Sequence, residues 1–321
     1  MKKLVSLIVT VFNKQDTIQK CLNSIKKQSY VKIEVLVIDD GSTDNSSKIA
    51  RKVCETDNRF KYYYQRNNGV SSARNLGLYK AKGDFVLFVD GDDFIDSNYV
   101  EKIMRYSNYD IVVSGYKRLR ENDIVAEVIR PQNIDFSIDS LNIFFSEDTF
   151  KFIGVPYSKL FKLSIIKKNK LKFDVEKDFG EDTEFVFKYL LKCRTVKYIS
   201  YSGYNDCIYL TNTLSRKNRS NVWEVNRDLV NALKLDINCN YDKNWTFLYM
   251  RAISLSLRAS VNNAKLFREV WKKVRRDKQF KKIRVKNIKS NSKKILYLLL
   301  RINAVSIAYN IYNKKMSKSN F

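Results

Sequence analysis

The sequence predicts an α/β fold in which helices flank a mostly parallel sheet, followed by a strongly basic, helical C-terminal region. Short apolar runs alternate with helical patterns over roughly the first 110 residues, and basic residues collect after residue 265. Continuous apolar runs are typical of strands covered on both faces, and strand–helix–strand alternation is typical of a parallel sheet. With 321 residues, the chain is long enough for one large domain or two smaller ones.

Strands are predicted where Val, Ile, Leu and Phe gather in short runs. Four such runs are Leu4–Phe12, Ile33–Asp39, Asp84–Asp90 and Asp110–Ser114. The first run follows two lysines, as a signal peptide would. No small-residue cleavage site comes after it, so we interpret it as a buried strand.

Helices are predicted between these strands and again after Trp223, from apolar residues at helical spacing and from polar residues placed to cap a helix. The four early helices are one containing Ile18, Cys21, Leu22 and Ile25, one over Asp44–Thr56 capped by Ser42 or Thr43, one over Ser71–Lys82, and one over Asn98–Tyr106 capped by Ser97.

The composition excludes several classes of enzyme. The chain has no histidine, which excludes Ser-His-Asp and Cys-His catalytic pairs and histidine zinc sites. Acid–base chemistry must therefore rest on Asp, Glu, Lys, Tyr or a bound metal. The five cysteines are widely spaced without a Cys-x-x-Cys pair, which indicates reduced thiols and a cytosolic compartment.

Aspartates gather at the ends of two predicted strands, although the formal net charge of the chain is +26. Asp39 and Asp40 end the second run, and Asp90, Asp92 and Asp93 end the third. One interpretation is a pair of solvated turns, because Asp-Gly and Asp-Asp form turns well. The other is a cation site, because like charges repel unless a cation joins them, and ligands bind at the carboxyl ends of parallel strands. Carboxylates without histidine favour Mg²⁺ or Mn²⁺, with a nucleotide diphosphate completing the shell.

Two common nucleotide motifs do not occur: GxxxxGK[ST] is absent, and no GxGxxG follows the first strand. Four blocks instead resemble the family 2 glycosyltransferases of the GT-A fold: SLIVTVFNK, VLVIDDGSTDNS, NNGVSSARNLGLYKAKGDFVLFVDGDD and GEDTEF, in this order. The resemblance covers roughly residues 3–215. It implies transfer of a sugar from a nucleotide diphosphate donor to an acceptor hydroxyl, with inversion at the anomeric carbon.

The resemblance also implies which residues hold the nucleotide. Thr10, Phe12 and Asn13 would line its pocket, although the family usually has Pro-x-Tyr-Asn there. Phe12 can stack on a base but lacks a phenol, and a place in the core is the alternative for it. Asp40, with Asp39 beside it, would contact the base or the ribose.

Two further blocks complete the implied donor site. Asn68, Gly69 and Arg74 match the family's Asn-x-Gly-x-x-x-Ala-Arg-Asn segment, and Arg74 would face the nucleotide. A surface salt bridge is the alternative for Arg74. Asp90-Gly91-Asp92 matches the DxD motif, whose acids would hold Mn²⁺ or Mg²⁺ on the diphosphate. Asp92 is the favoured direct ligand, with Asp90 on the ribose or behind the ligands and Asp93 in reserve, but which of them touches the metal stays open.

Inversion by direct displacement needs a base, which must be a carboxylate because histidine is absent. Asp182 in GEDTEF resembles the family's Glu-Asp motif and is the predicted base, with Glu181 as the second candidate. The alternative is a helix N-terminus enriched in acids.

Further matches are weaker. Ser215 and Arg216 resemble residues that lie over the diphosphate, with Lys217 or Arg219 as alternatives to Arg216. Lys159 matches a family lysine, but we assign it no chemistry.

The C-terminal region carries most of the excess charge. Between Lys265 and Lys294 the sequence has 14 Lys and Arg against 2 acids. The apolar residues there, at helical spacing, are Leu266, Phe267, Val270, Trp271 and Val274. They predict a basic amphipathic helix that binds an anionic membrane surface, with shallow contact from Ile295–Ile311. A solvated surface and nucleic-acid binding are the alternatives, and no nucleic-acid motif accompanies the charge.

These observations predict a catalytic domain over residues 1–215 and a helical, basic region over residues 216–321. The predicted enzyme is a hexosyl- or N-acetylhexosaminyltransferase of surface polysaccharide synthesis. It would use a UDP-sugar as the first candidate donor and a glycan or lipid-linked acceptor, at the inner face of the cell membrane. A homo-oligomer is left open. The alternative function is a membrane- or nucleic-acid-binding module with a vestigial nucleotide site.

Overall fold

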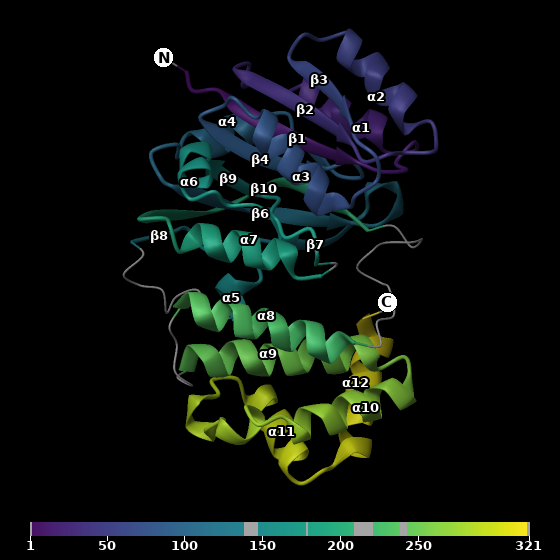
Figure 1. Ribbon diagram of the computed structural model, residues 1–321, viewed down its shortest axis with the longest axis vertical. Helices are drawn as coiled ribbons and strands as arrows, with labels where there is room; N and C mark the ends of the chain where they lie inside the picture. Colours follow the sequence, from purple (N-terminus) through teal and green to yellow (C-terminus); the bar gives the residue numbers. More distant parts are fainter. Residues whose placement is uncertain (1, 138–146, 178, 209–220, 238–242, 320–321) are drawn as a thin grey trace. The chain divides into compact units, whose positions relative to one another are not determined.

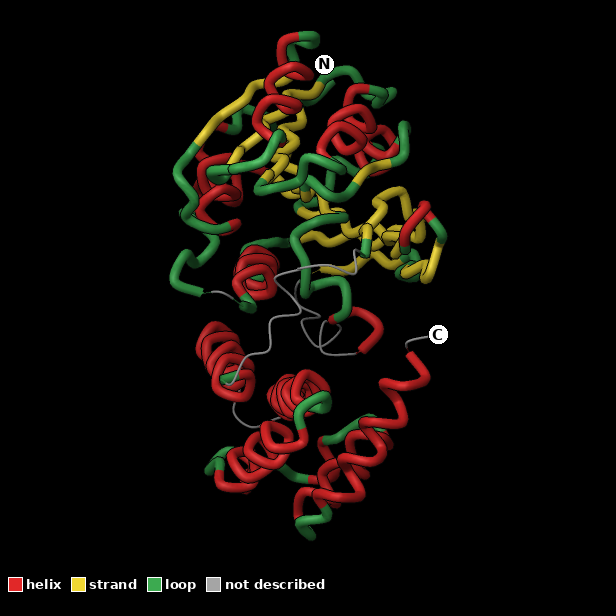
Figure 2. The backbone as a smooth tube through the Cα atoms, turned by 90° about the vertical axis from the view of Figure 1, so that its right-hand side faces the viewer, coloured by secondary structure: helices red, strands yellow, loops and turns green. Residues whose placement is uncertain are grey.

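The computed structural model describes residues 2–137, 147–177, 179–208, 221–237 and 243–319. The chain divides into two compact units, one formed by Met1–Leu141 with Glu147–Thr211 and the other by Asn142–Ser146 with Asn212–Phe321. The first unit contains the sheet. The second contains only helices and loops over its described residues (Figures 1 and 2).

A 10-stranded sheet forms the core of the first unit, in the order β3-β2-β1-β4-β9-β6-β10-β5, with β7 paired to β6 and β8 to β10. The strands are β1 (Val5–Val11), β2 (Ile33–Asp39), β3 (Phe60–Tyr64), β4 (Phe85–Asp90), β5 (Phe94–Ile95), β6 (Ile111–Leu119), β7 (Val125–Ile129), β8 (Ile134–Ser137), β9 (Lys159–Lys162) and β10 (Thr195–Cys207). The neighbouring pairs within β3-β2-β1-β4 and the pair β6–β10 are parallel, whereas β5, β7, β8 and β9 pair antiparallel. The predicted α/β fold is confirmed, with the parallel arrangement concentrated in β1 to β4.

The central parallel strands are almost completely buried, which explains their continuous apolar sequences. Every residue of β2 is buried, as are all of β1 except Thr10 and all of β4 except Asp90. The register sets Thr10 opposite Asp90 and Val11 opposite Asp39. The carboxyl ends of β2 and β4 therefore flank that of β1, at the edge where open parallel sheets bind ligands.

Helices α1 (Ile18–Lys26), α2 (Ser46–Glu55), α3 (Val70–Lys80) and α4 (Tyr99–Met104) lie between these strands in the sequence, as predicted. Two predicted caps are wrong, because α2 begins after Asn45 and α4 after Asn98. The Ser42 hydroxyl accepts the backbone N–H of Asn13 instead.

The second half of the first unit adds α5 (Glu147–Phe150), α6 (Leu163–Lys168) and α7 (Glu181–Leu190). The acids of GEDTEF do form the first turn of α7, after Gly180 in a left-handed conformation with φ 82°. This is the helix N-terminus considered as the alternative, and it orients Asp182 at the same time. The cysteines Cys21, Cys54, Cys193 and Cys207 are free thiols.

The second unit is helical, as predicted, with α8 (Val222–Ile237), α9 (Lys243–Ser260), α10 (Ala264–Arg276), α11 (Asn291–Arg301) and α12 (Val305–Ser319). Helix α10 is amphipathic, but its apolar residues are all buried. The expectation that this face contacts a membrane is therefore wrong, because it packs into the core of the second unit. No helix among the described residues is long and apolar enough to cross a membrane.

Candidate active site

The ends of β1 and β4 are joined by two hydrogen bonds. The Thr10 hydroxyl donates to Asp90 Oδ1 over 3.3 Å, and the Gly91 N–H donates to the Thr10 carbonyl over 3.0 Å. A Cβ on Gly91 would lie 2.8 Å from the Thr10 carbonyl oxygen, so this approach requires glycine. The match to the DxD motif thus lies directly beside the end of the first strand.

The end of β2 holds two buried carboxylates with different partners. Asp39 accepts hydrogen bonds from the Ser42 N–H, the Ser47 hydroxyl and the Tyr62 hydroxyl. Asp40 accepts from Gln65 Nε2 and from the backbone N–H groups of Asn68 and Gly69. The contacts of Asp40 fix the strand-end loop to the N-terminus of α3, and those of Asp39 fix it to α2 and β3. Asp39 is fully buried, so contact of its side chain with a nucleotide stays a prediction without geometric support.

Arg74, on α3, joins two carboxylates that are far apart in the sequence. Its guanidinium donates to Asp90 Oδ1 over 3.0 Å and to Asp182 Oδ1 over 2.6 Å. The Arg74 side chain is only 4% exposed, while those of Asp90 and Asp182 are 28% and 25% exposed. We call this arrangement the Arg74 bridge. The alternative interpretation of Arg74 as a surface salt bridge is therefore wrong. The Arg74 bridge also places Asp90, the implied donor-binding acid, close to Asp182, the implied base.

The environment of Asp182 favours its neutral form. Burial raises the pKa of Asp182 to about 7, with the nearby carboxylates of Glu181 and Asp90 adding to the rise and the charges of Arg74 and Lys159 opposing it. A carboxylate with this pKa is matched to proton transfer near neutral pH. Asp182 thus has the acid–base property expected of a general base.

Lys159 is a buried lysine next to this acid. Its ammonium donates to the carbonyls of Val155 and Tyr157 over 2.7 and 3.1 Å. Burial lowers the pKa of Lys159 to about 7, and the charge of Asp182 opposes the decrease. The lysine therefore fixes the Val155–Tyr157 backbone and contributes positive potential at Asp182.

The two acids that follow β4, Asp92 and Asp93, differ in how they are held. Asp92 forms an ion pair with Lys14, a residue to which the sequence assigned no role. Asp93 is buried and accepts from the Tyr204 hydroxyl over 2.6 Å and from the Cys207 N–H over 2.9 Å. Burial and the carboxylates of Asp92 and Asp90 hold the pKa of Asp93 well above its usual range. These contacts make Asp93 a fixed part of the fold and leave Asp92 as the more accessible of these two acids.

The side-chain oxygens at this point fit a hard divalent cation whose remaining ligands are phosphate oxygens of a bound nucleotide. Asp90 and Asp92 offer carboxylate oxygens, which Mg²⁺ and Mn²⁺ prefer, and Mg²⁺ commonly takes one or two protein carboxylates plus phosphate oxygens. The cations Arg74 and Lys14 already contact these two acids. Within the described ranges, no group of three or more His, Cys, Asp or Glu is arranged to hold a metal by itself.

Other predicted residues surround this point or lie outside the described ranges. Phe12 is 42% exposed, which makes its ring available for stacking and removes the core alternative. Asn13 has φ 50° and accepts the Thr43 N–H over 2.8 Å, so it ties the ends of β1 and β2. Ser215 and Arg216 lie outside the described residues.

Sequence reasoning missed the aromatic support beneath the acids. The Tyr204 hydroxyl accepts the Asp90 N–H, and the Tyr204 ring stacks on Tyr157 at 4.6 Å between centroids. The Tyr157 hydroxyl in turn donates to Asp206. These residues come from β10 and the segment before β9, and no local motif marks them. The position of Lys14 could have been predicted from the sequence, because it directly follows Asn13 at the end of the first strand.

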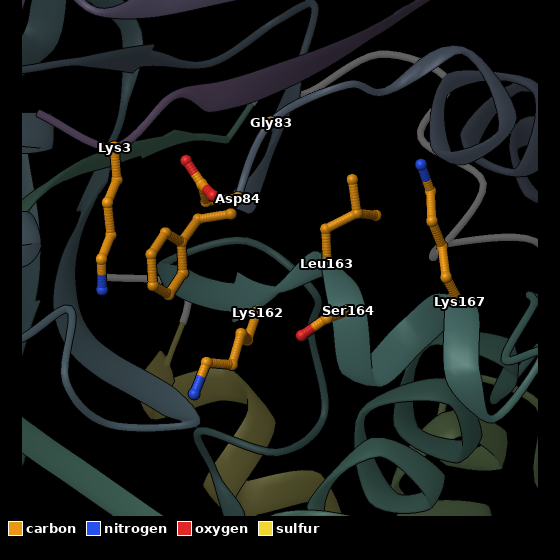
Figure 3. A pocket seen from close by; sticks show the side chains of 8 residues that line it. Lys3, Gly83, Asp84, Lys162, Leu163, Ser164 and Lys167 are labelled. Atoms are coloured by element: carbon orange, nitrogen blue, oxygen red, sulfur yellow. The ribbon is translucent and has the colours of Figure 1, made fainter. Parts of the chain in front are cut away.

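A cavity of about 290 Å³ in the first unit lies away from these acids. Its lining includes Lys3, Asp84, Lys162 and Lys167, which come from the amino ends of β1 and β4, from β9 and from α6 (Figure 3). The Asp90–Asp182 site lies at the opposite, carboxyl ends of β1 and β4. Lys162 pairs with Asp110, and Lys167 donates to the Ala81 carbonyl, so both cations serve the fold.

Comparisons with known proteins agree with this fold. A model of glycosyl transferase family 2 matches residues 6–169. The putative glycosyltransferase EpsH of Bacillus subtilis (strain 168) is 32% identical over 223 residues, which are 66% of this chain and 63% of EpsH. The chain thus spans less than two thirds of the length of this relative.

Two solved structures share the fold. The crystal structure of S. aureus TarS 1-349 in complex with UDP-GlcNAc matches with a TM-score of 0.72 at 18% identity, covering 99% of this chain and 92% of that chain. The mannosyltransferase PcManGT from Pyrobaculum calidifontis, in complex with GDP-Man and Mn²⁺, matches with a TM-score of 0.54 at 16% identity, covering 100% and 85%.

The parallel strands, with acids and a buried arginine at their carboxyl ends, define the class as an α/β protein with a site suited to a nucleotide diphosphate. The match over residues 6–169, about half of the chain, shows that it belongs to glycosyltransferase family 2. The match confirms the family on which the implied site was based.

Proposed function

We propose that the chain is an inverting glycosyltransferase that takes a hexosyl or N-acetylhexosaminyl group from a nucleotide diphosphate donor, with a UDP-sugar as the first candidate. The observation that carries the proposal is the Arg74 bridge, in which one buried guanidinium contacts Asp90 and Asp182. It joins an acid at a strand end, where donors bind, to a carboxylate suited to accept a proton. The UDP-GlcNAc complex of TarS supports the choice of a UDP-sugar.

The nucleotide would lie across the carboxyl ends of β1, β2 and β4. The exposed ring of Phe12 is suited to stack on the base. The Nε atom of Arg74 is buried and has no hydrogen-bond acceptor among the described residues. A buried N–H without an acceptor is costly, so an oxygen of the donor that reached it would be favoured.

Asp92 and Asp90 are the residues that would hold a divalent cation. When bound, Mn²⁺ or Mg²⁺ supplies positive charge to the diphosphate leaving group. Lys14, paired with Asp92, would turn toward the same phosphates or toward solvent. The Mn²⁺ in the PcManGT complex supports this choice of ion.

Asp182 would act as the general base. Its carboxylate takes the proton of the acceptor hydroxyl while that oxygen bonds to the anomeric carbon, and the bond from that carbon to the diphosphate breaks with its electron pair. The pKa of about 7 permits this transfer near neutral pH. Arg74 keeps the Asp182 carboxylate oriented, and Glu181 is the second candidate for this step.

The acceptor would be a hydroxyl of a glycan or a lipid-linked sugar in surface polysaccharide synthesis, reached at the inner face of the cell membrane. The basic C-terminal sequence supports a membrane location, with +12 between Lys265 and Lys294 from 14 basic and 2 acidic residues. No nucleic-acid partner is proposed, and an assembly of several copies stays a prediction.

The test is to incubate the full chain with UDP-, GDP- and TDP-sugars, with and without Mn²⁺, and to measure the nucleotide released. We expect metal-dependent release from at least one donor, with a UDP-sugar the first to respond. If no donor is cleaved and no nucleotide binds in the presence of Mn²⁺, the enzyme proposal is wrong. That result would favour the alternative, a binding module with a vestigial site.

A further inference from the structure

Exposed aliphatic side chains line two helices of the second unit. Ile295, Leu298 and Ile302 follow the i, i+3, i+7 spacing of one helix face on and just after α11, and Ile307 and Ile311 follow the i, i+4 spacing on α12. Their exposed fractions run from 37% for Ile311 to 72% for Ile302. We call these five side chains the aliphatic stripe. Grouped exposed aliphatics of this kind mark interaction surfaces.

A hollow lies beside the stripe. It is a cavity of about 290 Å³ between α9, α11 and α12. Ile295 and Ile311 both line it, so the two rows of the stripe meet there. Its lining also contains Arg258 and Lys293 and the hydroxyl-bearing Tyr312. The positive charges of Arg258 and Lys293 beside aliphatic side chains are complementary to a phospholipid, which joins a phosphate to hydrocarbon chains.

Contacts with the core of the second unit hold the hollow in shape. The Ser254 and Tyr312 hydroxyls are 3.1 Å apart and link α9 to α12. Trp271 Nε1 donates to Asn303 Oδ1 over 3.1 Å, in the turn between α11 and α12. Lys293 Nζ lies 4.8 Å from the Phe247 ring, and burial lowers the pKa of Lys293 to about 8. An anion in the hollow would favour the charged form of this lysine.

The charge of the region decides between the candidate occupants. After Asp277 the sequence contains 12 Lys and Arg and no acid. A second copy of this surface would bring like charges together, which opposes self-association through it. A nucleic acid would satisfy the charge but gain little from five exposed aliphatic side chains. An anionic lipid surface satisfies both, because basic residues attract its headgroups and aliphatic side chains enter its interface.

We propose that α11 and α12 dock the chain onto an anionic membrane, with the aliphatic stripe in the headgroup region and one lipid phosphate in the hollow between Arg258 and Lys293. The contact does not use the apolar face of α10. It goes beyond the proposed reaction and can hold or fail independently of it.

The test measures co-sedimentation of the full chain with two kinds of vesicle. One kind is phosphatidylcholine alone, and the other contains phosphatidylglycerol as about a third of its lipid, which is a level that gives a strong surface potential. Leu298→Asp with Ile302→Asp removes the centre of the stripe, and Val31→Asp, at an exposed aliphatic position of the first unit, is the matched control. Arg258→Ala tests the hollow, with Arg268→Ala on the exposed face of α10 as its control.

We expect binding to the anionic vesicles only, weakened at least about tenfold by the double substitution and by Arg258→Ala, but not by either control. Release of nucleotide by the same variants should match that of the unchanged chain, which separates this proposal from the proposed reaction. Equal binding by all variants, or no binding to anionic vesicles, overturns the proposal. The proposal is also wrong if the double substitution changes the oligomeric state of the chain. It is wrong as well if the chain binds RNA more tightly than anionic vesicles and the double substitution leaves that RNA binding intact.

Discussion

Arg74 is the residue through which the parts of the site are connected. It lies on α3 and contacts Asp90 at 16 residues' separation and Asp182 at 108 residues' separation. Breaking a buried ion pair by removing one partner leaves an uncompensated charge, which is strongly destabilising. The bridge therefore sets both the position of Asp182 and the potential in which it titrates.

The pKa of Asp182 predicts the pH dependence of the reaction. A general base must be deprotonated to accept a proton, and burial raises the pKa of Asp182 to about 7. The rate of nucleotide release should therefore fall about tenfold for each pH unit below 7 and level off above it. A rate that stays constant from pH 5 to pH 8 would remove Asp182 as the base.

Substitution of Arg74 should move the acid limb of the pH–rate profile, where the rate falls below pH 7, to higher pH. Its positive charge lowers the pKa of Asp182, so Arg74→Gln should shift the limb to higher pH by about one unit or more. Arg74→Lys keeps the charge and is the matched variant, with a clearly smaller shift expected. The measurement is the pH–rate profile of both variants, and an unmoved limb in Arg74→Gln would show that the bridge does not tune the base.

At the residue scale, the motif blocks predicted Thr10, Asp90, Arg74 and Asp182, which the structure brings together. They did not predict the bridge itself, because Arg74 on α3 and Asp182 on α7 are 108 residues apart and meet only in the folded chain. Tyr204 was not predicted because its contact with Asp93 spans 111 residues. Asp93 was taken as a reserve ligand because sequence position does not reveal that its two oxygens are used within the fold.

At the element scale, the strands that match predictions are those buried on both faces. β1, β2 and β4 read as continuous apolar runs, and the structure places them within one residue of the predicted bounds. β3 was missed because its sequence, FKYYY, is only partly buried and carries a lysine. β6 extends to Leu119, beyond the predicted Ser114, because its later residues pair with β7 and β10. Such pairings are non-local and leave little trace in a short window.

The buried face of α10 gives a prediction at the same scale. Trp271 is 1% exposed, so Trp271→Ala should destabilise the second unit by about 3–5 kcal/mol. The measurement is urea unfolding, with Lys272→Ala on the exposed face as the control. A fully stable Trp271→Ala variant that lost vesicle binding would instead place the apolar face of α10 on the membrane.

At the scale of the whole molecule, the chain forms two compact units with separate cores. Units of this kind commonly unfold in separate steps, so one midpoint does not describe the chain. The described residues that carry the proposed donor site, Thr10, Arg74, Asp90 and Asp182, lie in the first unit. The aliphatic stripe lies in the second unit. Ligands for the two sites should therefore act on different transitions.

Calorimetry can separate these transitions. UDP with Mn²⁺, at about 100 times its dissociation constant, should stabilise the first unit by about 2.7 kcal/mol and leave the second unchanged. The same nucleotide without metal should stabilise it less. Equal shifts in both transitions would contradict the placement of the donor site in the first unit.

The central claim is that Asp182 performs the proton transfer for a donor held at the ends of β1, β2 and β4. It is tested most directly by comparing the unchanged chain with Asp182→Asn for release of UDP from a UDP-sugar with Mn²⁺, and for binding of that donor. The account predicts nearly equal donor binding and a rate lower by about 10²–10⁴, the usual contribution of a general base. Undiminished release by Asp182→Asn would contradict it.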